Sequence, residues 1–225
     1  MDKYGVQRVA RWMSCKRVKA TFFVYPYRAQ VAAQDISDRV RMLSDLGHEV
    51  GQHTHFYAGT KIDKPEKVND LSDANIARCL HRDFETLQHI GHTPKGFTAG
   101  AWFVNETVLD TVTTLGFTYD CSARFPKPNK TTYSSFQRWI QSPQAYVNSQ
   151  GRLLCLPTSC SLGEWYKWGR KTKVDGQVPY QLVYLHDYDL LSLYKYLSLW
   201  CFLRIMRVGD MQPLASILEQ YAIRG

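Results

Sequence analysis

The chain has 225 residues, of which 44% are hydrophobic and 13% aromatic, enough apolar material for one α/β domain over residues 1–225. The formal net charge of +8 comes from dispersed basic residues, without the basic and aromatic stripe typical of nucleic-acid binding, so nucleic acid is not an expected partner. The six cysteines form no Cys-x-x-Cys pair, which excludes a zinc knuckle and a dense disulfide framework.

The first half of the chain alternates helical and strand patterns. Apolar residues at helical spacing predict helices over residues 6–18, 35–46 and 73–90. Short apolar runs predict buried strands over residues 20–25 and 49–52. Because residues 1–18 carry no apolar signal segment, the sequence predicts a cytoplasmic protein, unless the true start lies upstream.

The second half continues the alternation. Residues 124–149 are rich in Pro, Asn and Ser, and we expect an irregular excursion there. The remaining predicted elements are strands over 96–99, 117–120, 153–157 and 181–186, a helix capped by Asn105 and ending at Leu115, and helices over 191–208 and 214–223. Such alternation is typical of a parallel sheet or barrel with helices outside.

Residues 191–208 form the most apolar stretch of the chain. Lys195, Arg204 and Arg207 interrupt this stretch, and its uninterrupted run is too short to span a bilayer, so no stable membrane insertion is expected. Two interpretations stay open for it: a packed amphipathic helix, or a contact with a membrane surface.

Polar residues with metal-binding or catalytic chemistry follow the predicted strands. His53 and His55 lie two apart, and residues two apart on a strand project to the same side, where both rings can reach one metal ion. Trp102 follows the next strand, Asp120 ends another, and the pair His186-Asp187 ends the last. Since the carboxyl ends of parallel strands carry the reactive groups of α/β folds, we expect a shared site there.

Four segments carry a family resemblance. Lys19 to Val24, Gly47 to Thr54, Gly96 to Trp102, and Tyr184 to His186 resemble, in this order, the motifs of the polysaccharide deacetylase (NodB-like) family. The resemblance implies a distorted (β/α) barrel with about seven strands. It also implies a divalent metal, with zinc the first choice, and hydrolysis of an N-acetyl or O-acetyl group on a carbohydrate substrate.

The resemblance also implies roles for individual residues. His53 and His55 are the expected metal ligands, and His186 is the expected acid that protonates the leaving group. Tyr57 and Trp102 are candidates for contacts with the sugar. Asp187, a further candidate at the substrate site, either orients the imidazole of His186 or begins the next loop.

The chain departs from the family pattern at three places. Family members usually carry two aspartates on a first strand ahead of Ala20, whereas here only Asp2 precedes it; Asp2 is either a remnant of that catalytic acidic motif or an ordinary terminal residue. The chain thus looks truncated or divergent at its amino end. Thr98 stands where the family usually has an arginine, and Tyr57 stands where it has the second metal histidine.

Two alternatives to a deacetylase remain. His-x-His at a strand end also resembles the metal motif of amidohydrolases and of polymerase-and-histidinol-phosphatase phosphoesterases, although those families place it on their first strand. The second alternative is a degenerate member of the family that binds a glycan or a partner without turnover, which Thr98 favours. The sequence does not predict an oligomeric state.

Overall fold

The computed structural model describes residues 3–26, 33–56, 72–126, 137–169, 180–205, 211–216 and 218. They fall into two compact units, and each is described on its own. Unit 1 takes its residues from Met1–Phe22, Arg41–Glu49 and Thr158–Gly225, and unit 2 from Phe23–Val40 and Val50–Pro157. The expectation of one domain over residues 1–225 stays a prediction.

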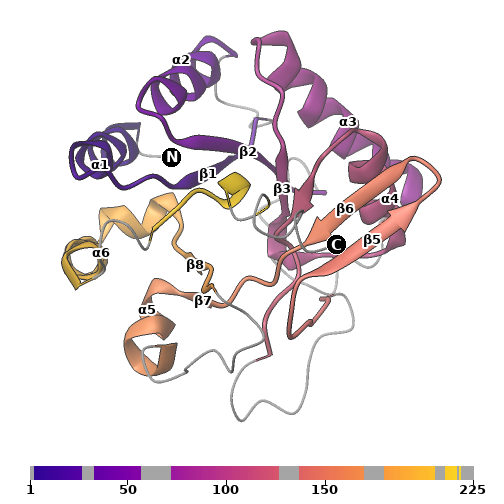
Figure 1. The fold of residues 1–225 in the computed structure, drawn as a ribbon. Helices are drawn as coiled ribbons and strands as arrows, with labels where there is room; N and C mark the ends of the chain where they lie inside the picture. Colours follow the sequence, from indigo (N-terminus) through magenta and orange to yellow (C-terminus); the bar gives the residue numbers. More distant parts are fainter. Residues whose placement is uncertain are drawn as a thin grey trace. The chain divides into compact units, whose positions relative to one another are not determined.

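A six-stranded sheet runs in the order β1-β2-β3-β4-β6-β5 (Figure 1). Its strands are β1 (Thr21–Val24), β2 (Glu49–Thr54), β3 (Gly96–Ala99), β4 (Tyr119–Asp120), β5 (Gln144–Asn148) and β6 (Gly151–Cys155). The pairs β2–β3, β3–β4 and β4–β6 are parallel, whereas β5 and β6 form an antiparallel hairpin. The parallel register brings the carboxyl ends of β2, β3, β4 and β6 to the same edge of the sheet.

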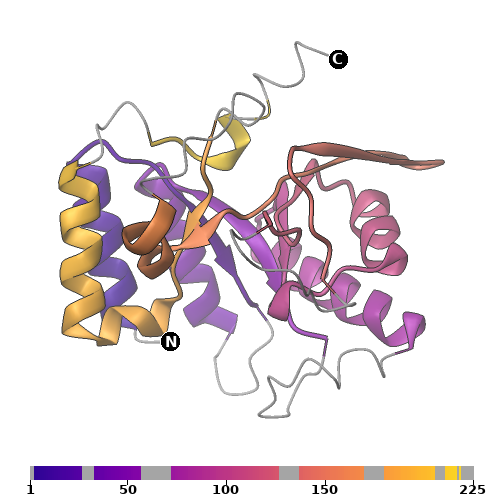
Figure 2. The same cartoon turned by 90° about the horizontal axis from the view of Figure 1, so that it is seen from below.

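The helices of unit 2 begin at side-chain caps. Helix α3 (Asp73–His89) starts where the Ser72 hydroxyl accepts a hydrogen bond from the Asn75 amide, and it ends just before Gly91, whose φ of 79° suits glycine. Helix α4 (Glu106–Thr114) starts at Asn105, whose side chain accepts from the Val108 amide at 2.9 Å. The two helices lie side by side (Figures 1 and 2).

The core of unit 2 lies between these two helices and the sheet. Its apolar residues are fully or almost fully buried and recur at helical spacing on α3 and α4 and at strand positions on β3 and β6. Its large, fully buried side chains include Phe56, Ile76, Leu80, Phe97, Val108 and Leu153. Burial of this set is the main source of stability for unit 2.

Unit 1 contains mostly helices and one small sheet. Its elements are α1 (Lys3–Cys15), β7 (Cys160–Ser161), α5 (Leu162–Glu164), the π-helical turn η3 (Trp165–Gly169), β8 (Val183–Tyr184), the 3-10 helix η4 (Asp187–Leu191) and α6 (Leu193–Ile205). Strands β7 and β8 pair in parallel as a separate two-stranded sheet. Val9 and Met13 of α1 share one apolar cluster with Leu199 and Phe202 of α6, and the two helices lie next to each other (Figures 1 and 2).

Buried His48 is a structural residue of unit 1. Its Nδ1 accepts a hydrogen bond from the Ala20 amide at 3.3 Å, which leaves Nε2–H to donate to the Ala10 carbonyl at 2.9 Å. The histidine therefore ties the residue before β2 to helix α1 and to the start of β1.

The predicted alternation of elements is confirmed, as is the α/β class with a parallel sheet. Helix α2 (Ala33–Asp45) and strand β3 match their predicted positions closely, and the other elements shift by a few residues at their ends. The described strands lie in two sheets rather than in one closed ring. None of the helices that the structure describes has both the length and the apolar character that crossing a lipid bilayer requires.

The prediction of an irregular segment over residues 124–149 is wrong at its carboxyl end. Strand β5 occupies Gln144–Asn148 and pairs with β6 along its whole length. Its side chains are mostly exposed, with Val147 69% exposed, so the usual alternation of buried and exposed residues is missing. The sequence pattern of this segment is therefore that of a loop, although its hydrogen bonds to β6 make it an edge strand. The predicted helix over residues 214–223 lies mostly outside the described residues.

Candidate functional site

His53 and His55 bring two imidazole rings together at the carboxyl end of β2. His53 is the fifth residue of the strand and His55 follows its last residue, so both project from one face while Thr54 points to the other. The ring centroids lie 4.7 Å apart and the two Nε2 atoms 3.0 Å apart. Both side chains are half-buried. The structure thus joins the two predicted ligands, and their role in holding a metal stays a prediction.

The tautomer of His53 is set by the neighbouring strand. His53 pairs with Thr98 in the parallel register of β2 and β3, and the Thr98 carbonyl oxygen lies 2.9 Å from His53 Nδ1. A carbonyl only accepts hydrogen bonds, so Nδ1 carries the proton and Nε2 of the neutral ring presents a lone pair, which accepts from Nε2–H of His55 at 3.0 Å. A backbone carbonyl in this position is the usual outer partner of a metal-binding histidine.

Gly100 makes room for the second ring. A Cβ at this position would lie 2.4 Å from Nδ1 of His55 and 2.7 Å from its Cε1, far inside van der Waals contact. Any side chain at residue 100 would therefore push the imidazole away from its present place. Absence of a side chain at Gly100 is what allows His55 to lie against the turn that follows β3.

Tyr25 packs against both imidazoles from the end of β1. Its ring centroid lies 5.0 Å from that of His55 and 6.3 Å from that of His53, both in edge-to-face geometry. Burial, reinforced by the Asp83 charge, raises the pKa of Tyr25 to about 12, and its hydroxyl is hydrogen-bonded to Arg82. Tyr25 is thus a neutral phenol that restricts the motion of the histidine pair.

A buried polar network lies on the other side of β2. Gln52 donates from Nε2 to the Thr54 hydroxyl at 3.0 Å, and Thr54 in turn hydrogen-bonds to the Asp83 carboxylate on α3. Arg82 donates to Oδ1 of Asp83 from Nε at 2.9 Å and from Nη2 at 2.7 Å. Gln52, Thr54 and Asp83 have no exposed surface. This network fastens the end of β2 to α3 and so fixes the backbone between the two histidines.

Asp120 ends β4 at the same edge of the sheet. Its Oδ1 accepts hydrogen bonds from the amide of Ser122, at 3.0 Å, and from the Ser122 hydroxyl, which itself accepts from the Ala99 amide. The side chain is fully buried, and burial raises the pKa of Asp120 to about 6. Asp120 therefore joins the ends of β3 and β4.

Trp102, the predicted sugar-stacking residue, lies in the short 3-10 turn η2 (Gly100–Trp102) after β3. The guanidinium of Arg124 lies 4.4 Å from the centroid of its ring and 5.3 Å from that of Trp139. One cation thus bridges two indoles. Contact between Trp102 and a sugar stays a prediction.

His186 and Asp187 belong to unit 1. His186 precedes the 3-10 helix η4, its ring stacks on Tyr188 at 4.6 Å, and its Nδ1 lies 3.8 Å from Oδ2 of Asp189. Burial lowers the pKa of His186, although the nearby Asp189 and Asp187 oppose this shift. Because the histidine pair lies in unit 2, the predicted convergence of His186 with His53 and His55 stays a prediction.

Two predicted site residues, Asp2 and Tyr57, lie outside the described residues. Among the residues that are described, no group of three or more His, Cys, Asp or Glu side chains gathers closely enough to hold a metal ion. His53 and His55 nevertheless fit part of a divalent site, because their Nε2 atoms converge and a carbonyl fixes one tautomer.

The sequence analysis does not predict the buried polar network behind β2, although the sequence contains a signal for Asp83. Ile76, Leu80 and Leu87 form the buried stripe of α3, and Asp83 lies on that stripe. A carboxylate on an apolar helix face needs a buried partner, and the structure supplies Arg82 and Thr54. Gln52 and Thr54 alternate with the histidines, which also marks them as residues of the opposite face.

The fold and the histidine pair together describe an α/β protein with a candidate metal site at the carboxyl ends of parallel strands. The polysaccharide deacetylase model matches residues 3–119, more than half of the chain, and the protein therefore belongs to the polysaccharide deacetylase family. No curated protein matches the sequence.

Solved structures support the same fold at low sequence identity. The chitin deacetylase of Colletotrichum lindemuthianum is 16% identical with a TM-score of 0.55, covering 95% of this chain and 80% of its own. The Xyl-CE4 domain of a multidomain xylanase from the hindgut metagenome of Trinervitermes trinervoides is 14% identical with a TM-score of 0.53, covering 99% and 86%.

A protein of Mycobacterium smegmatis described as a polysaccharide deacetylase is 19% identical with a TM-score of 0.51. The alignment covers 93% of this chain but only 62% of that one. The present chain thus spans less than two thirds of the length of this relative.

Proposed function

We propose that this protein is a divalent-metal-dependent hydrolase that removes acetyl groups from an N- or O-acetylated sugar. Membership of the polysaccharide deacetylase family supports the reaction class. The observation that carries the proposal is the 3.0 Å approach of the two Nε2 atoms, with Nδ1 of His53 held by the Thr98 carbonyl. The proposal includes a cytoplasmic location.

His53 and His55 would hold the metal ion, for which zinc is the first choice because imidazole nitrogens suit it well. A divalent ion in such a site polarises an acetyl carbonyl and lowers the pKa of a bound water. The protein's own contribution is to keep both Nε2 atoms directed at one point. Tyr25 and Gly100 confine the ring of His55, and the network of Gln52, Thr54 and Asp83 holds the strand behind it.

His186 is assigned the proton transfer to the leaving group. Since burial lowers its pKa, the imidazole is neutral near pH 7 and can take up a proton before passing it on. Asp189 accepts a hydrogen bond from the His186 amide at 3.1 Å and, with Asp187, places negative charge beside the ring that stabilises the protonated form. Asp2, the acidic residue ahead of Ala20, is assigned the role of the base that takes the proton of the attacking water, as a remnant of the family's acidic motif.

A second candidate function is glycan binding without turnover. Thr98 favours it, because a threonine side chain cannot form the ion pair that the arginine usual at this position makes with a catalytic carboxylate. The two candidates share a carbohydrate ligand and differ in acetate release.

The test measures bound metal and acetate release with the same preparations. Purified protein is loaded with zinc, dialysed and analysed for metal, and then incubated with N-acetylated and O-acetylated oligosaccharides. His53→Ala and His55→Ala are compared with His89→Ala, a matched control on the exposed face of α3. We expect the wild type and His89→Ala to retain metal and release acetate, and the two site variants to lose both.

Each other outcome has a definite meaning. Retention of metal by both His53→Ala and His55→Ala would contradict the proposed site. Metal and glycan binding by the wild type without acetate release from either substrate would establish the binding protein instead of the hydrolase.

A further inference from the structure

Helix α6 is apolar on both of its sides. Leu199, Phe202 and Leu203 face the core of unit 1, as expected for a packed helix. The opposite side and the residues just before the helix are also apolar, yet exposed. These exposed residues are Tyr188 (58%), Leu191 (65%), Leu193 (74%), Tyr194 (79%), Leu197 (49%) and Ile205 (47%). A helix with this composition is normally covered on all sides.

Helix α1 extends this apolar surface. Trp12 of α1 and Tyr196, Leu197 and Trp200 of α6 line an open pocket of about 300 Å³. We use the name α1–α6 face for the exposed surface of two segments. One is residues 8–16, in α1 and just past its end, and the other is residues 188–205. The pocket makes this face continuous from one helix to the other.

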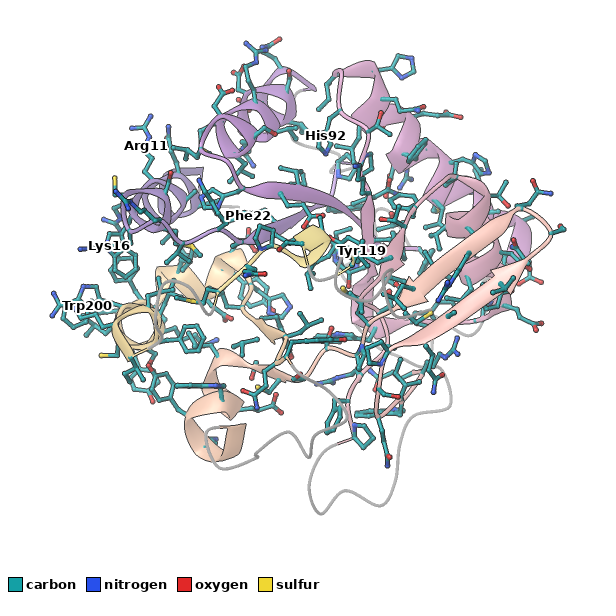
Figure 3. The ribbon with its side chains drawn as sticks, viewed as in Figure 1. Arg11, Lys16, Phe22, His92, Tyr119 and Trp200 are labelled. Carbon is teal, nitrogen blue, oxygen red and sulfur yellow. The ribbon has the colours of Figure 1, made fainter. Side chains whose placement is uncertain are left out.

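The two helices of the α1–α6 face are basic, and the acidic Asp189 of η4 is ion-paired with Lys195. Neither α1 nor α6 contains an Asp or Glu, whereas Arg8, Arg11, Lys195 and Arg204 are exposed on them. The guanidinium of Arg8 lies 5.0 Å from the ring centroid of Tyr196, and that of Arg204 lies 3.9 Å from that of Trp200. Figure 3 shows Arg11, Lys16 and Trp200 projecting along this edge.

The basic charge and the exposed apolar side chains together discriminate between three candidate partners for the α1–α6 face. A second copy of the chain related by twofold symmetry would bring basic helices against basic helices, which is repulsive. A soluble acidic polymer would neutralise the arginines but leave leucine and tyrosine side chains in water. An anionic bilayer offers phosphates to the basic groups and the boundary of the acyl chains to the apolar ones.

We propose that the α1–α6 face binds the surface of an anionic lipid bilayer, with the exposed apolar side chains of α6 inserted at the headgroup boundary. Helix α6 has 13 residues and is thus roughly 20 Å long, so it lies on the membrane rather than across it. Tyr194 and Trp200 have the amphipathic rings that favour this depth. Arg8, Arg11 and Arg204 contact the lipid phosphates.

The test is flotation of the whole protein with vesicles of phosphatidylcholine alone or with phosphatidylglycerol added. Binding to the mixed vesicles and not to the neutral ones is expected, with loss of binding as the ionic strength rises from about 0.1 M to about 1 M and the screening length falls from ~10 Å to ~3 Å. Each basic residue at such a surface changes binding about fivefold, so Arg8→Gln with Arg204→Gln is expected to weaken it roughly 25-fold.

The apolar contribution is tested separately with Leu193→Ser and Leu197→Ser, which are expected to abolish flotation. Matched controls on the β5–β6 hairpin are Val147→Ser and Arg152→Gln, both at exposed positions, and they are expected to float like the wild type. Circular dichroism and thermal unfolding of each variant confirm that the changed residues, and not a loss of fold, account for the result.

Three outcomes would overturn the proposal: equal binding to neutral and anionic vesicles, equal weakening by the hairpin controls, and absence of vesicle binding. Light scattering of the protein without lipid tests whether a second copy of the chain covers the face instead of a membrane. If the wild type self-associates and Leu193→Ser with Leu197→Ser prevents it while no vesicle binds, the face is a dimer interface and not a membrane contact.

Discussion

The Thr98 carbonyl oxygen accepts a hydrogen bond from Nδ1 of His53 over 2.9 Å. The parallel pairing of β2 with β3 places these two residues side by side, so the contact depends on backbone register and not on the threonine side chain. One strand therefore decides which nitrogen of the neighbouring strand's histidine carries the proton.

Substitutions at His53 separate the two ring nitrogens. In His53→Asn the amide nitrogen replaces Nδ1 and keeps the bond to Thr98, whereas in His53→Gln the amide reaches the position of Nε2. We expect both variants to lose metal, and His53→Gln to have a free energy of unfolding lower by about 1 kcal/mol than His53→Asn. Chemical unfolding and metal analysis check this. Wild-type metal content in His53→Asn would show that Nε2 is not the ligand atom.

Gly100→Ala tests the space beside His55. The new methyl group would lie 2.4 Å from Nδ1 of His55, so the ring has to move and the pair of Nε2 atoms separates. We expect a loss of about 1–3 kcal/mol in the free energy of unfolding and a clear fall in zinc affinity. Gly163→Ala is the control, because nothing lies within 4 Å of its Cβ position. Equal zinc affinity in the two variants would argue against the packing described for His55.

Tyr25 acts through its ring. Tyr25→Phe keeps the edge-to-face contacts with both imidazoles, whereas Tyr25→Ala removes them. An aromatic pair contributes about 1 kcal/mol, so we expect Tyr25→Ala to weaken zinc binding several-fold and Tyr25→Phe to leave it nearly unchanged. Calorimetric titration with zinc measures both. A large defect in Tyr25→Phe would instead give the hydroxyl the essential role.

Asp120 predicts a pH dependence of stability. Burial raises the pKa of Asp120 from 3.8 to about 6. A group whose pKa is raised by folding contributes stability that is fully present below pH 3.8 and is lost as the pH rises through about 6. In the wild type, we expect this carboxyl group to lower the free energy of unfolding by roughly 2 kcal/mol between about pH 4 and about pH 8. In Asp120→Asn we expect this decrease to be absent. Urea unfolding across this range measures the difference.

Asp110→Asn is the matched control for Asp120→Asn. Hydrogen bonds from Asn148 and Tyr146 lower the pKa of the exposed Asp110, so its contribution has the opposite sign: it is present above 3.8 and is lost as the pH falls further. Identical pH profiles for the two variants would contradict the assignment of the raised pKa to Asp120.

The order of helices and strands was predictable because each element repeats a simple pattern. The stripe of α3 and the short apolar run of β3 are visible in the residues themselves, whereas β5 is not, since pairing with β6 and not burial makes it a strand. The histidine pair was predictable from its spacing on β2. The pairing of Arg82 with Asp83 behind that strand was not, because only tertiary packing brings these two side chains to its end.

The turn after β3 limits how the sequence can change there. Ala101 and Trp102 have φ values of 56° and 54°, a conformation that costs side-chain-bearing residues about 1–3 kcal/mol each. The Gln137 amide donates to the Ala101 carbonyl at 3.1 Å, and Arg124 covers Trp102, so neighbouring groups offset part of this cost. Directed evolution at residue 101 should accordingly recover glycine, asparagine or alanine and reject valine and isoleucine, whose branched Cβ cannot enter the left-handed region.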